Sequence, residues 1–89
     1  MYYVYILWSQ RLRKRYIGST EYLERRVLQH NKGYSRFTKS GIPWQVIHTE
    51  KYDSIEQARK REHYLKGGTG RRWLDEFYPN YRRGARVVE

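Results

Sequence analysis

Two side chains suited to binding a phosphate ester lie on a helical face that is otherwise apolar. At about 100° per residue, Arg26 and His30 share this face with Leu23 and Val27. Burial of a guanidinium is costly without an anion, so Arg26 either meets an internal carboxylate or lines a cleft that a phosphate enters. We favour the cleft, because the chain has nine Asp and Glu against nineteen Lys and Arg.

A carboxylate occupies the corresponding place in a second predicted helix. Its apolar stripe comprises Ile55, Ala58, Glu62 and Leu65. Glu62 therefore either forms a salt bridge, for which Arg26 is a candidate, or holds a divalent cation. We favour the cation, because a hard metal ion prefers carboxylate oxygens and needs few protein ligands when water and phosphate supply the others.

A predicted β-hairpin precedes these helices. Residues 2–8 are mostly β-branched or aromatic, and residues 14–19 form a second short strand after a cationic turn. Tyr5 lies on the same side of the first strand as Leu7, and an antiparallel partner brings Tyr16 opposite that row. Rings in strands are usually ordinary packing, so the hairpin alone is weak evidence for a site.

The rest of the pattern predicts an α+β domain. Ser19 and Thr20 offer an N-cap to the first helix, and Ser54 opens a capping box for the second. The glycines at 67–70 predict a C-cap and turn, because no strand or Walker lysine pattern accompanies them. We expect a small three-stranded antiparallel sheet flanked by helices. The expected strands are 2–8, 14–19 and 44–51, and the expected helices are 21–31, 54–66 and 71–77.

Length and charge constrain the partner. Eighty-nine residues make one domain, which we place at 1–78, followed by a basic, mobile tail over 79–89. A net charge of +10, spread over the whole chain, predicts a polyanionic partner, and nucleic acid ranks well ahead of an anionic membrane. The absence of cysteine and of a signal peptide before the first strand leads us to expect a cytoplasmic protein.

Two loops carry the expected nucleic-acid contacts. The tip of the hairpin is cationic, and residues 32–41 mix cations with aromatic rings, which suits backbone tracking and base stacking. A plain surface connection is the alternative for residues 32–41. The expected contacts are Arg11, Arg13, Lys14, Arg15, Lys32, Tyr34, Arg36 and Lys39.

The order of these features resembles the GIY-YIG nuclease family. Tyr3-Val4-Tyr5, Tyr16-Ile17-Gly18, the helix with Arg26 and His30, and the helix with Arg61-Glu62 follow one another at matching distances over residues 2–75. The chain looks similar to small stand-alone members that are like the N-terminal catalytic domain of the excinuclease C subunit. One position departs from the pattern, since the glycine of the first motif is replaced while Tyr5 keeps the tyrosine.

This resemblance implies roles for individual residues. Tyr5 and Tyr16 are the motif tyrosines, Arg26 and His30 are the polar groups of the first helix, and Glu62 is the ligand of one Mg²⁺ or Mn²⁺. We favour Tyr5 as general base, a role that it could exchange with Tyr16. Nearby positive charge or a hydrogen bond must lower a tyrosine pKa from about 10 for this role.

The function that the resemblance implies is a metal-dependent DNA endonuclease. We expect it to be structure-selective or weakly sequence-specific and to act in DNA repair or recombination. The alternatives are a nucleic-acid-binding module that does not cut, and a basic accessory protein that docks on an acidic partner. Neither alternative needs a carboxylate on the buried stripe of the second helix.

Overall fold

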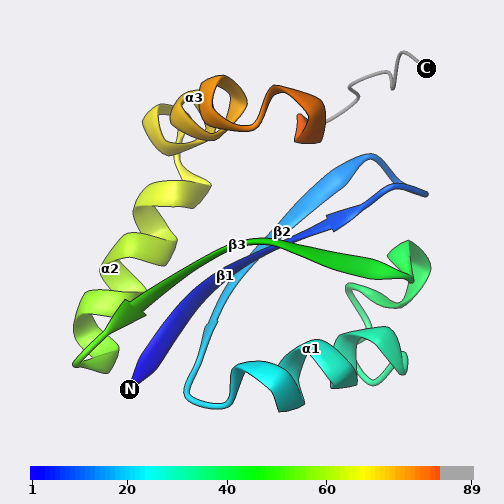
Figure 1. The fold of residues 1–89 in the computed structure, drawn as a ribbon, viewed down its shortest axis with the longest axis horizontal. Helices are drawn as coiled ribbons and strands as arrows, with labels where there is room; N and C mark the ends of the chain where they lie inside the picture. Colours follow the sequence, from blue (N-terminus) through cyan, green and yellow to red (C-terminus); the bar gives the residue numbers. More distant parts are fainter. Residues whose placement is uncertain (83–89) are drawn as a thin grey trace.

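A computed structural model describes residues 1–82. Its three strands, β1 (Tyr2–Ser9), β2 (Lys14–Thr20) and β3 (Trp44–Tyr52), form one antiparallel sheet in the order β2-β1-β3 (Figure 1). The hairpin turn places Arg13 in the left-handed region, at φ 53°, and the Arg13 amide donates to the Ser9 carbonyl over 2.7 Å. The predicted α+β fold with a three-stranded antiparallel sheet is confirmed.

Helices cover both faces of this sheet (Figure 1). Helix α1 (Leu23–Asn31) packs on one face, whereas α2 (Ile55–Lys66) and α3 (Gly68–Phe77) pack on the other. Two short 3-10 helices, η1 (Lys39–Gly41) and η2 (Pro79–Tyr81), complete the described chain.

The alternation of side chains along β1 divides the core in two. On the α2 and α3 face the buried side chains are aliphatic, namely Val4, Ile6, Ile17, Ala58, Leu65 and Leu74. On the α1 face the cluster is smaller and more polar, with Tyr5, Leu7 and Trp44 at its centre. Leu7 pairs with Tyr16 across the hairpin, so the predicted placement of Tyr16 beside the Tyr5 row is confirmed.

The start of α1 differs from the predicted one. The helix begins at Leu23, and its N-cap residue Tyr22 makes no side-chain cap. Thr20 Oγ1 accepts from the Tyr22 amide over 3.1 Å, ahead of the helix, while the Ser19 hydroxyl donates to Glu62. The predicted N-cap hydroxyl is therefore wrong, because a partner on α2 takes one of the two hydroxyls.

The junction between α2 and α3 is tighter than the glycine pattern indicated. Ser54 caps α2 as predicted by accepting from the Gln57 amide over 3.2 Å. Helix α3, however, begins at Gly68 rather than at 71, so part of the predicted turn is helical. A Cβ on Gly70 would overlap the backbone at Tyr64 and Leu65, and glycine thus permits α3 to start directly against the end of α2.

A half-buried ionic cluster, which we call the Glu50 network, fastens α2 to β3. Arg61 donates Nε and Nη2 to the two Glu50 carboxylate oxygens over 2.9 and 3.1 Å, and the Tyr52 hydroxyl donates to Oε1 over 2.6 Å. His48 lies 2.8 Å from Glu50 and 2.7 Å from the Tyr78 hydroxyl. Burial raises the Glu50 pKa, but hydrogen bonds from Arg61, Tyr52 and His48 outweigh it and lower that pKa to about 2.

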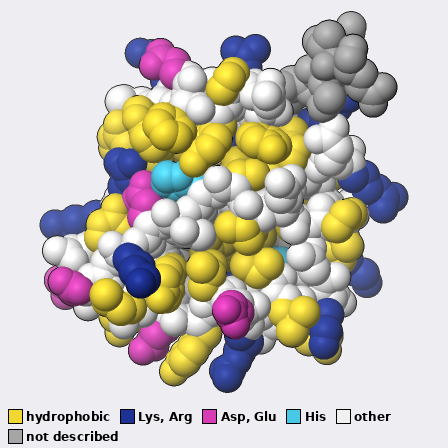
Figure 2. Space-filling view, viewed as in Figure 1, with side chains coloured by type: hydrophobic (Ala, Val, Ile, Leu, Met, Phe, Trp, Pro, Cys, Tyr) yellow, Lys and Arg dark blue, Asp and Glu magenta, His cyan; other side chains and the backbone are white. Residues whose placement is uncertain are grey.

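The chain stays packed beyond the predicted domain end at residue 78. The ring of Tyr81 lies edge-on to Trp8, with 5.5 Å between centroids, and this contact holds η2 against β1. Residues 83–89 of the predicted tail lie outside the described residues, so the tail stays a prediction. Figure 2 shows hydrophobic side chains gathered over α3, with Lys and Arg mostly around the rim of this face. No helix of the described chain is long and apolar enough to span a membrane.

Candidate active site

A chain of hydrogen bonds begins at Tyr5 in the middle of β1. The Tyr5 hydroxyl lies 3.0 Å from His30 Nε2, and both residues are almost completely buried, at 1% and 0% exposure. His30 Nδ1 lies 2.7 Å from the Thr38 hydroxyl, and the contact of that hydroxyl with the Ser35 carbonyl is longer, at 3.5 Å. Two arrangements of protons fit these contacts: Thr38 accepts from Nδ1 while Nε2 accepts from Tyr5, or Thr38 donates to Nδ1 while Nε2 donates to Tyr5.

Burial lowers the His30 pKa, and the nearby Arg26 charge lowers it further, so the imidazole is neutral at pH 7. A neutral imidazole with its proton on Nδ1 can take a second proton only at Nε2. We call the series Tyr5, His30, Thr38 and Ser35 the Tyr5 relay.

Tyr16 borders this relay from β2. Its ring centroid lies 4.9 Å from that of His30 and 6.3 Å from that of Tyr5. Unlike Tyr5, it is only half-buried. Gly18 faces Tyr5 across the hairpin, where an added Cβ would come within 2.5 Å of the Tyr5 hydroxyl oxygen. Glycine at the end of the Tyr16-Ile17-Gly18 motif therefore makes room for the Tyr5 hydroxyl.

Arg26 brings positive charge to both tyrosines. A hydrogen bond with Tyr5 raises the Arg26 pKa, opposed by burial, and a weaker one with Tyr16 adds to the rise. Arg26 Nη1 also donates to Gln29 Oε1 over 3.3 Å. Arg26 forms no ion pair with any residue in 1–82, so the internal carboxylate considered as the alternative to a cleft is absent from this part of the chain.

Burial dominates the acidity of Tyr5 itself. Loss of hydration raises the Tyr5 pKa to about 12, although the hydrogen bond with Arg26 acts in the opposite direction. Tyr16 and Glu62 contribute smaller electrostatic effects. A free Tyr5 phenolate is therefore rare at neutral pH.

Glu62 reaches the same region from the other face of the sheet. Its Oε1 accepts from the Ser19 hydroxyl over 2.5 Å, and its Oε2 lies 2.5 Å from Lys66 Nζ. The salt bridge considered between Glu62 and Arg26 is therefore wrong, since Lys66 is the partner of this carboxylate. The side chain of Glu62 retains 20% exposure at the β2 edge.

The donor set around Glu62 fits a sparsely coordinated hard cation. No group of three or more His, Asp or Glu arranged to hold a metal occurs within residues 1–82. One carboxylate offers about four lone pairs, of which Ser19 and Lys66 use two. Mg²⁺ often binds one or two carboxylates and takes its other ligands from water and phosphate. Glu62 is thus a fitting ligand, provided that the metal shares it with the Lys66 ammonium.

The family comparison agrees with this geometry. A family model described as the GIY-YIG catalytic domain matches residues 1–75. The chain belongs to the GIY-YIG family. The match includes both tyrosine motifs, α1 and α2.

Similar proteins of this GIY-YIG group occur in archaea and bacteria. A UPF0213 protein of Natronomonas pharaonis is 39% identical over 66 residues, which are 73% of this chain and 76% of that protein. Another from Haloquadratum walsbyi is 40% identical over 55 residues, 61% of this chain and 62% of that protein. A third, from Clostridium perfringens, is 34% identical over 67 residues, 74% of this chain and 71% of that protein. No solved structure matches the chain.

The predicted nucleic-acid contacts of this GIY-YIG domain gather at one end of the sheet. The Ser9 hydroxyl, beside the hairpin turn, donates to the Gly41 carbonyl over 2.6 Å and so ties the hairpin to the 32–41 loop. Arg13 and Arg15 are half-buried, and Arg15 forms an ion pair with Asp75. The exposed members of the set are Arg11, Lys14, Lys32, Tyr34, Arg36 and Lys39.

Sequence reasoning missed three residues that contact the predicted set. Lys66 lies one helical turn after Glu62, so the i,i+4 spacing could have indicated it. Ser19 was assigned to a helix cap instead of to Glu62. Thr38 carries no sequence signal for its contact with His30, because the loop that brings it there has no periodicity.

Proposed function

We propose that this protein is a divalent-metal-dependent endonuclease that hydrolyses phosphodiester bonds in DNA. The observation that carries the proposal is the meeting of Tyr5, Tyr16, Arg26 and His30 around one hydrogen-bonded group, with Glu62 at the adjacent sheet edge. Membership of the GIY-YIG family supports the same chemistry.

The Tyr5 relay suggests how a buried tyrosine serves as general base. As Tyr5 takes a proton from the attacking water, it passes its own proton to His30 Nε2, so no free phenolate forms. The water oxygen would bond to phosphorus, and the leaving oxygen would depart with the electron pair of its bond to phosphorus and take up a proton from solvent. This step uses the arrangement in which Thr38 accepts from Nδ1, which leaves Nε2 free to take the proton. Positioned proton transfer of this kind typically contributes roughly 10²–10⁴-fold in rate.

The remaining groups would act on the phosphate. Arg26 would offset the charge that develops on the phosphoryl oxygens, and the half-buried Tyr16 would orient the water or the phosphate. Glu62 would hold one Mg²⁺ or Mn²⁺, which supplies Lewis-acid stabilisation of the phosphate when bound. In this assignment each predicted site residue has a separate role.

Exposed rings favour a substrate with unpaired bases. Tyr34 and Phe37 are 74% and 88% exposed in the loop that also carries Lys32, Arg36 and Lys39. Aromatic side chains stack on bases that have left a duplex, while the cations bind phosphates. We therefore propose branched or flap DNA as substrate, as for an excinuclease C-like enzyme of DNA repair or recombination, and only weak sequence preference.

The Glu62→Gln variant tests the proposal. The glutamine side chain keeps the shape and can still accept from Ser19, so we expect an unchanged melt, lost cleavage, and DNA binding that is retained or improved. Glu56→Gln, which alters an exposed carboxylate on the same helix, is the matched control. Flap, branched and plain duplex DNA, and RNA, are incubated with Mg²⁺, with Mn²⁺ and with EDTA.

Each alternative gives a different result. Binding without cleavage by the wild-type protein on every substrate would favour the non-cutting module. Failure to bind any nucleic acid would favour the basic accessory protein. Cleavage that persists in Glu62→Gln, or in EDTA, would refute the metal assignment.

A further inference from the structure

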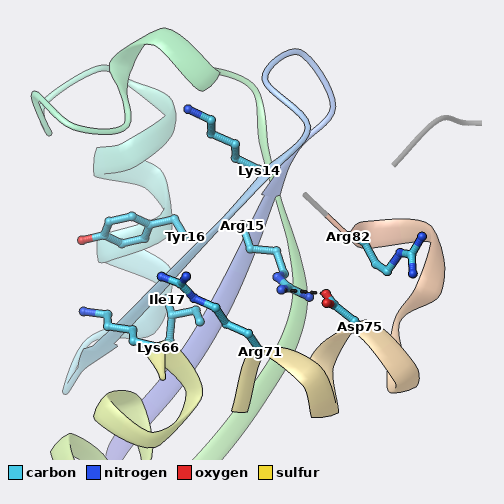
Figure 3. A pocket seen from close by; sticks show the side chains of 8 residues that line it. All are labelled: Lys14, Arg15, Tyr16, Ile17, Lys66, Arg71, Asp75 and Arg82. Carbon is cyan, nitrogen blue, oxygen red and sulfur yellow. Dashed lines mark ion pairs between the residues drawn. The ribbon is translucent and has the colours of Figure 1, made fainter. Parts of the chain in front are cut away.

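A basic pocket lies between β2 and α3, beside the candidate active site (Figure 3). Its volume is about 570 Å³, within the range of small-molecule binding sites. The lining residues are Lys14, Arg15, Tyr16, Ile17, Lys66, Arg71, Asp75 and Arg82. The proposed function has assigned no role to Arg71 or Arg82.

The charges that line this pocket are poorly balanced. Five cations face one carboxylate, and that carboxylate, Asp75, already pairs with Arg15 over 2.9 Å. The Arg15 side chain is only 8% exposed, and its Nη1 is buried with no hydrogen-bond partner in the described chain. Lys14, Arg71 and Arg82 take part in no ion pair with a residue in 1–82. Like charges gathered in a concavity favour an anionic ligand.

The pocket adjoins the groups that would perform the chemistry. Tyr16 belongs both to the pocket lining and to the ring cluster around His30. Lys66 lines the pocket and bonds Glu62, the proposed metal ligand. In Figure 3 the Tyr16 hydroxyl and the Lys66 ammonium point to the same side, and the Arg71 guanidinium lies between them and the Arg15–Asp75 ion pair.

The chemistry of the lining suits a nucleic-acid backbone. The forked donors of a guanidinium match two phosphate oxygens, and Ile17 with the Tyr16 ring gives apolar surface for a sugar. An acidic peptide would also be attracted by the cations. The proposed phosphodiester-hydrolysis site beside the pocket favours a nucleic acid instead.

We infer that this pocket is a phosphate subsite that holds the substrate strand at the phosphate next to the scissile one, with Arg71 as its central ligand. The inference rests on the proposed function, because it takes the scissile phosphate to lie between Tyr16 and Glu62. Arg82 extends the same subsite along the strand.

A comparison of neighbouring arginines tests the inference. Arg71→Gln and Arg72→Gln make the same charge change at successive positions of α3, but only Arg71 lines the pocket. Binding of a flap oligonucleotide is measured in EDTA, without cleavage, at several salt concentrations. We expect Arg71→Gln to weaken binding roughly five- to tenfold and to reduce the salt slope by about 0.7–0.9, the value of one phosphate contact. Arg72→Gln should change both quantities much less.

Neutral methylphosphonates, introduced one at a time, then locate the contact. A methylphosphonate beside the cleavage position should weaken binding to the wild-type protein and have no further effect on Arg71→Gln. Equal losses in Arg71→Gln and Arg72→Gln would overturn the subsite, as would the absence of any position that couples to Arg71. If Arg71→Gln fails to fold in a thermal melt, Arg82→Gln replaces it in the same comparison.

Different results would refute the proposed nuclease activity and the proposed phosphate subsite. If one methylphosphonate position couples to Arg71 but the wild-type protein never cleaves with Mg²⁺ or Mn²⁺, the phosphate contact of the pocket stands, whereas the proposed nuclease and the position of the contact beside a scissile phosphate fall. If cleavage is metal-dependent but no coupling to Arg71 appears, the nuclease stands and the subsite falls.

Discussion

The two faces of the sheet each carry a polar network, and the two networks differ in what they leave unsatisfied. The Glu50 network is closed, because the carboxylate receives both forked donors of Arg61 and the Tyr52 hydroxyl. The Tyr5 relay is open at one end, since the Tyr5 oxygen adjoins Arg26, which has no carboxylate partner in the described chain. A closed network stabilises the fold, whereas an open one keeps donors and charge for a ligand.

The pKa values express the same difference. Donors around Glu50 lower its pKa to about 2, so this carboxylate stays charged over the whole physiological range. Burial around Tyr5 raises its pKa to about 12, so the hydroxyl keeps its proton. The first group is fixed in one protonation state, and the second can change state only by exchanging protons with a partner. Substitutions in the two networks should therefore affect different measurements.

The largest expected effect is on the activity of Tyr5→Phe. Loss of the hydroxyl removes the first member of the relay, and we expect cleavage to fall roughly 10²–10⁴-fold. Stability should fall by only about 1–2 kcal/mol, because His30 Nε2 loses its partner while packing is kept. Tyr3→Phe, two residues earlier in β1, is the control. Cleavage at the wild-type rate by Tyr5→Phe would remove Tyr5 from the chemistry.

The Glu50→Gln variant should lose stability and keep its cleavage activity, the reverse of Tyr5→Phe. Loss of the charge breaks the pairing with Arg61 in a site where the Glu50 side chain is 18% exposed, and we expect unfolding to become easier by roughly 2–3 kcal/mol. Cleavage per folded molecule should stay near wild type, because the network lies on the face opposite to the relay. Thermal melts and cleavage assays at a temperature where both proteins are folded separate the two effects.

Lowering the pH provides a control for the predicted loss of stability in Glu50→Gln. The Glu50 pKa is lowered from 4.5 to about 2 in the folded protein, so its stabilisation is fully present above pH 4.5 and is lost as pH falls towards 2. The stability difference between wild type and Glu50→Gln should therefore shrink over that interval. A difference that stays constant between pH 5 and pH 2 would show that the charge of Glu50 does not stabilise the fold.

A smaller effect is expected at Gly18. The added methyl group of Gly18→Ala would press on the Tyr5 hydroxyl and move it away from His30. Misplacement of a catalytic group on this scale should lower cleavage roughly ten- to hundredfold. Gly68→Ala is a matched control, since a Cβ there meets no atom within 4 Å. Equal activities of the two variants would mean that the position of the Tyr5 hydroxyl is unimportant.

The sequence predicted the residues around the Tyr5 relay better than those of the Glu50 network. Helical and strand periodicity placed Arg26, His30 and Glu62 on inward faces and Tyr16 beside Tyr5, because those positions depend on local geometry. The Glu50 network was not predicted, since its contacts come from α2 and from the segment after α3.

Tertiary packing explains the remaining omissions. Arg71 and Arg82 line the basic pocket because α3, which starts at Gly68, and the segment after it bring these two arginines to the same concavity as Lys14 and Arg15 of β2. The close contact of Gly70 with the end of α2 sets the direction of α3, and no periodic pattern in the sequence encodes it. The pairing of Glu62 with Lys66 was local and could have been found from its spacing.

The smallest expected effect concerns Lys66, which forms an ion pair with the proposed metal ligand Glu62. The Lys66 ammonium donates a hydrogen bond to Glu62 Oε2, where it competes with a metal ion for the same oxygen. The Lys66 side chain is 50% exposed, so the competition is weak, and removal of this charge should improve metal affinity only about two- to fivefold. Calorimetric titration of Lys66→Gln with Mn²⁺ in the absence of DNA measures this directly and avoids the role of Lys66 in the basic pocket. Lys60→Gln, which alters an exposed cation of the same helix, should leave the affinity unchanged. Weaker Mn²⁺ binding by Lys66→Gln would mean that the ammonium orients Glu62 for the metal instead of competing with it.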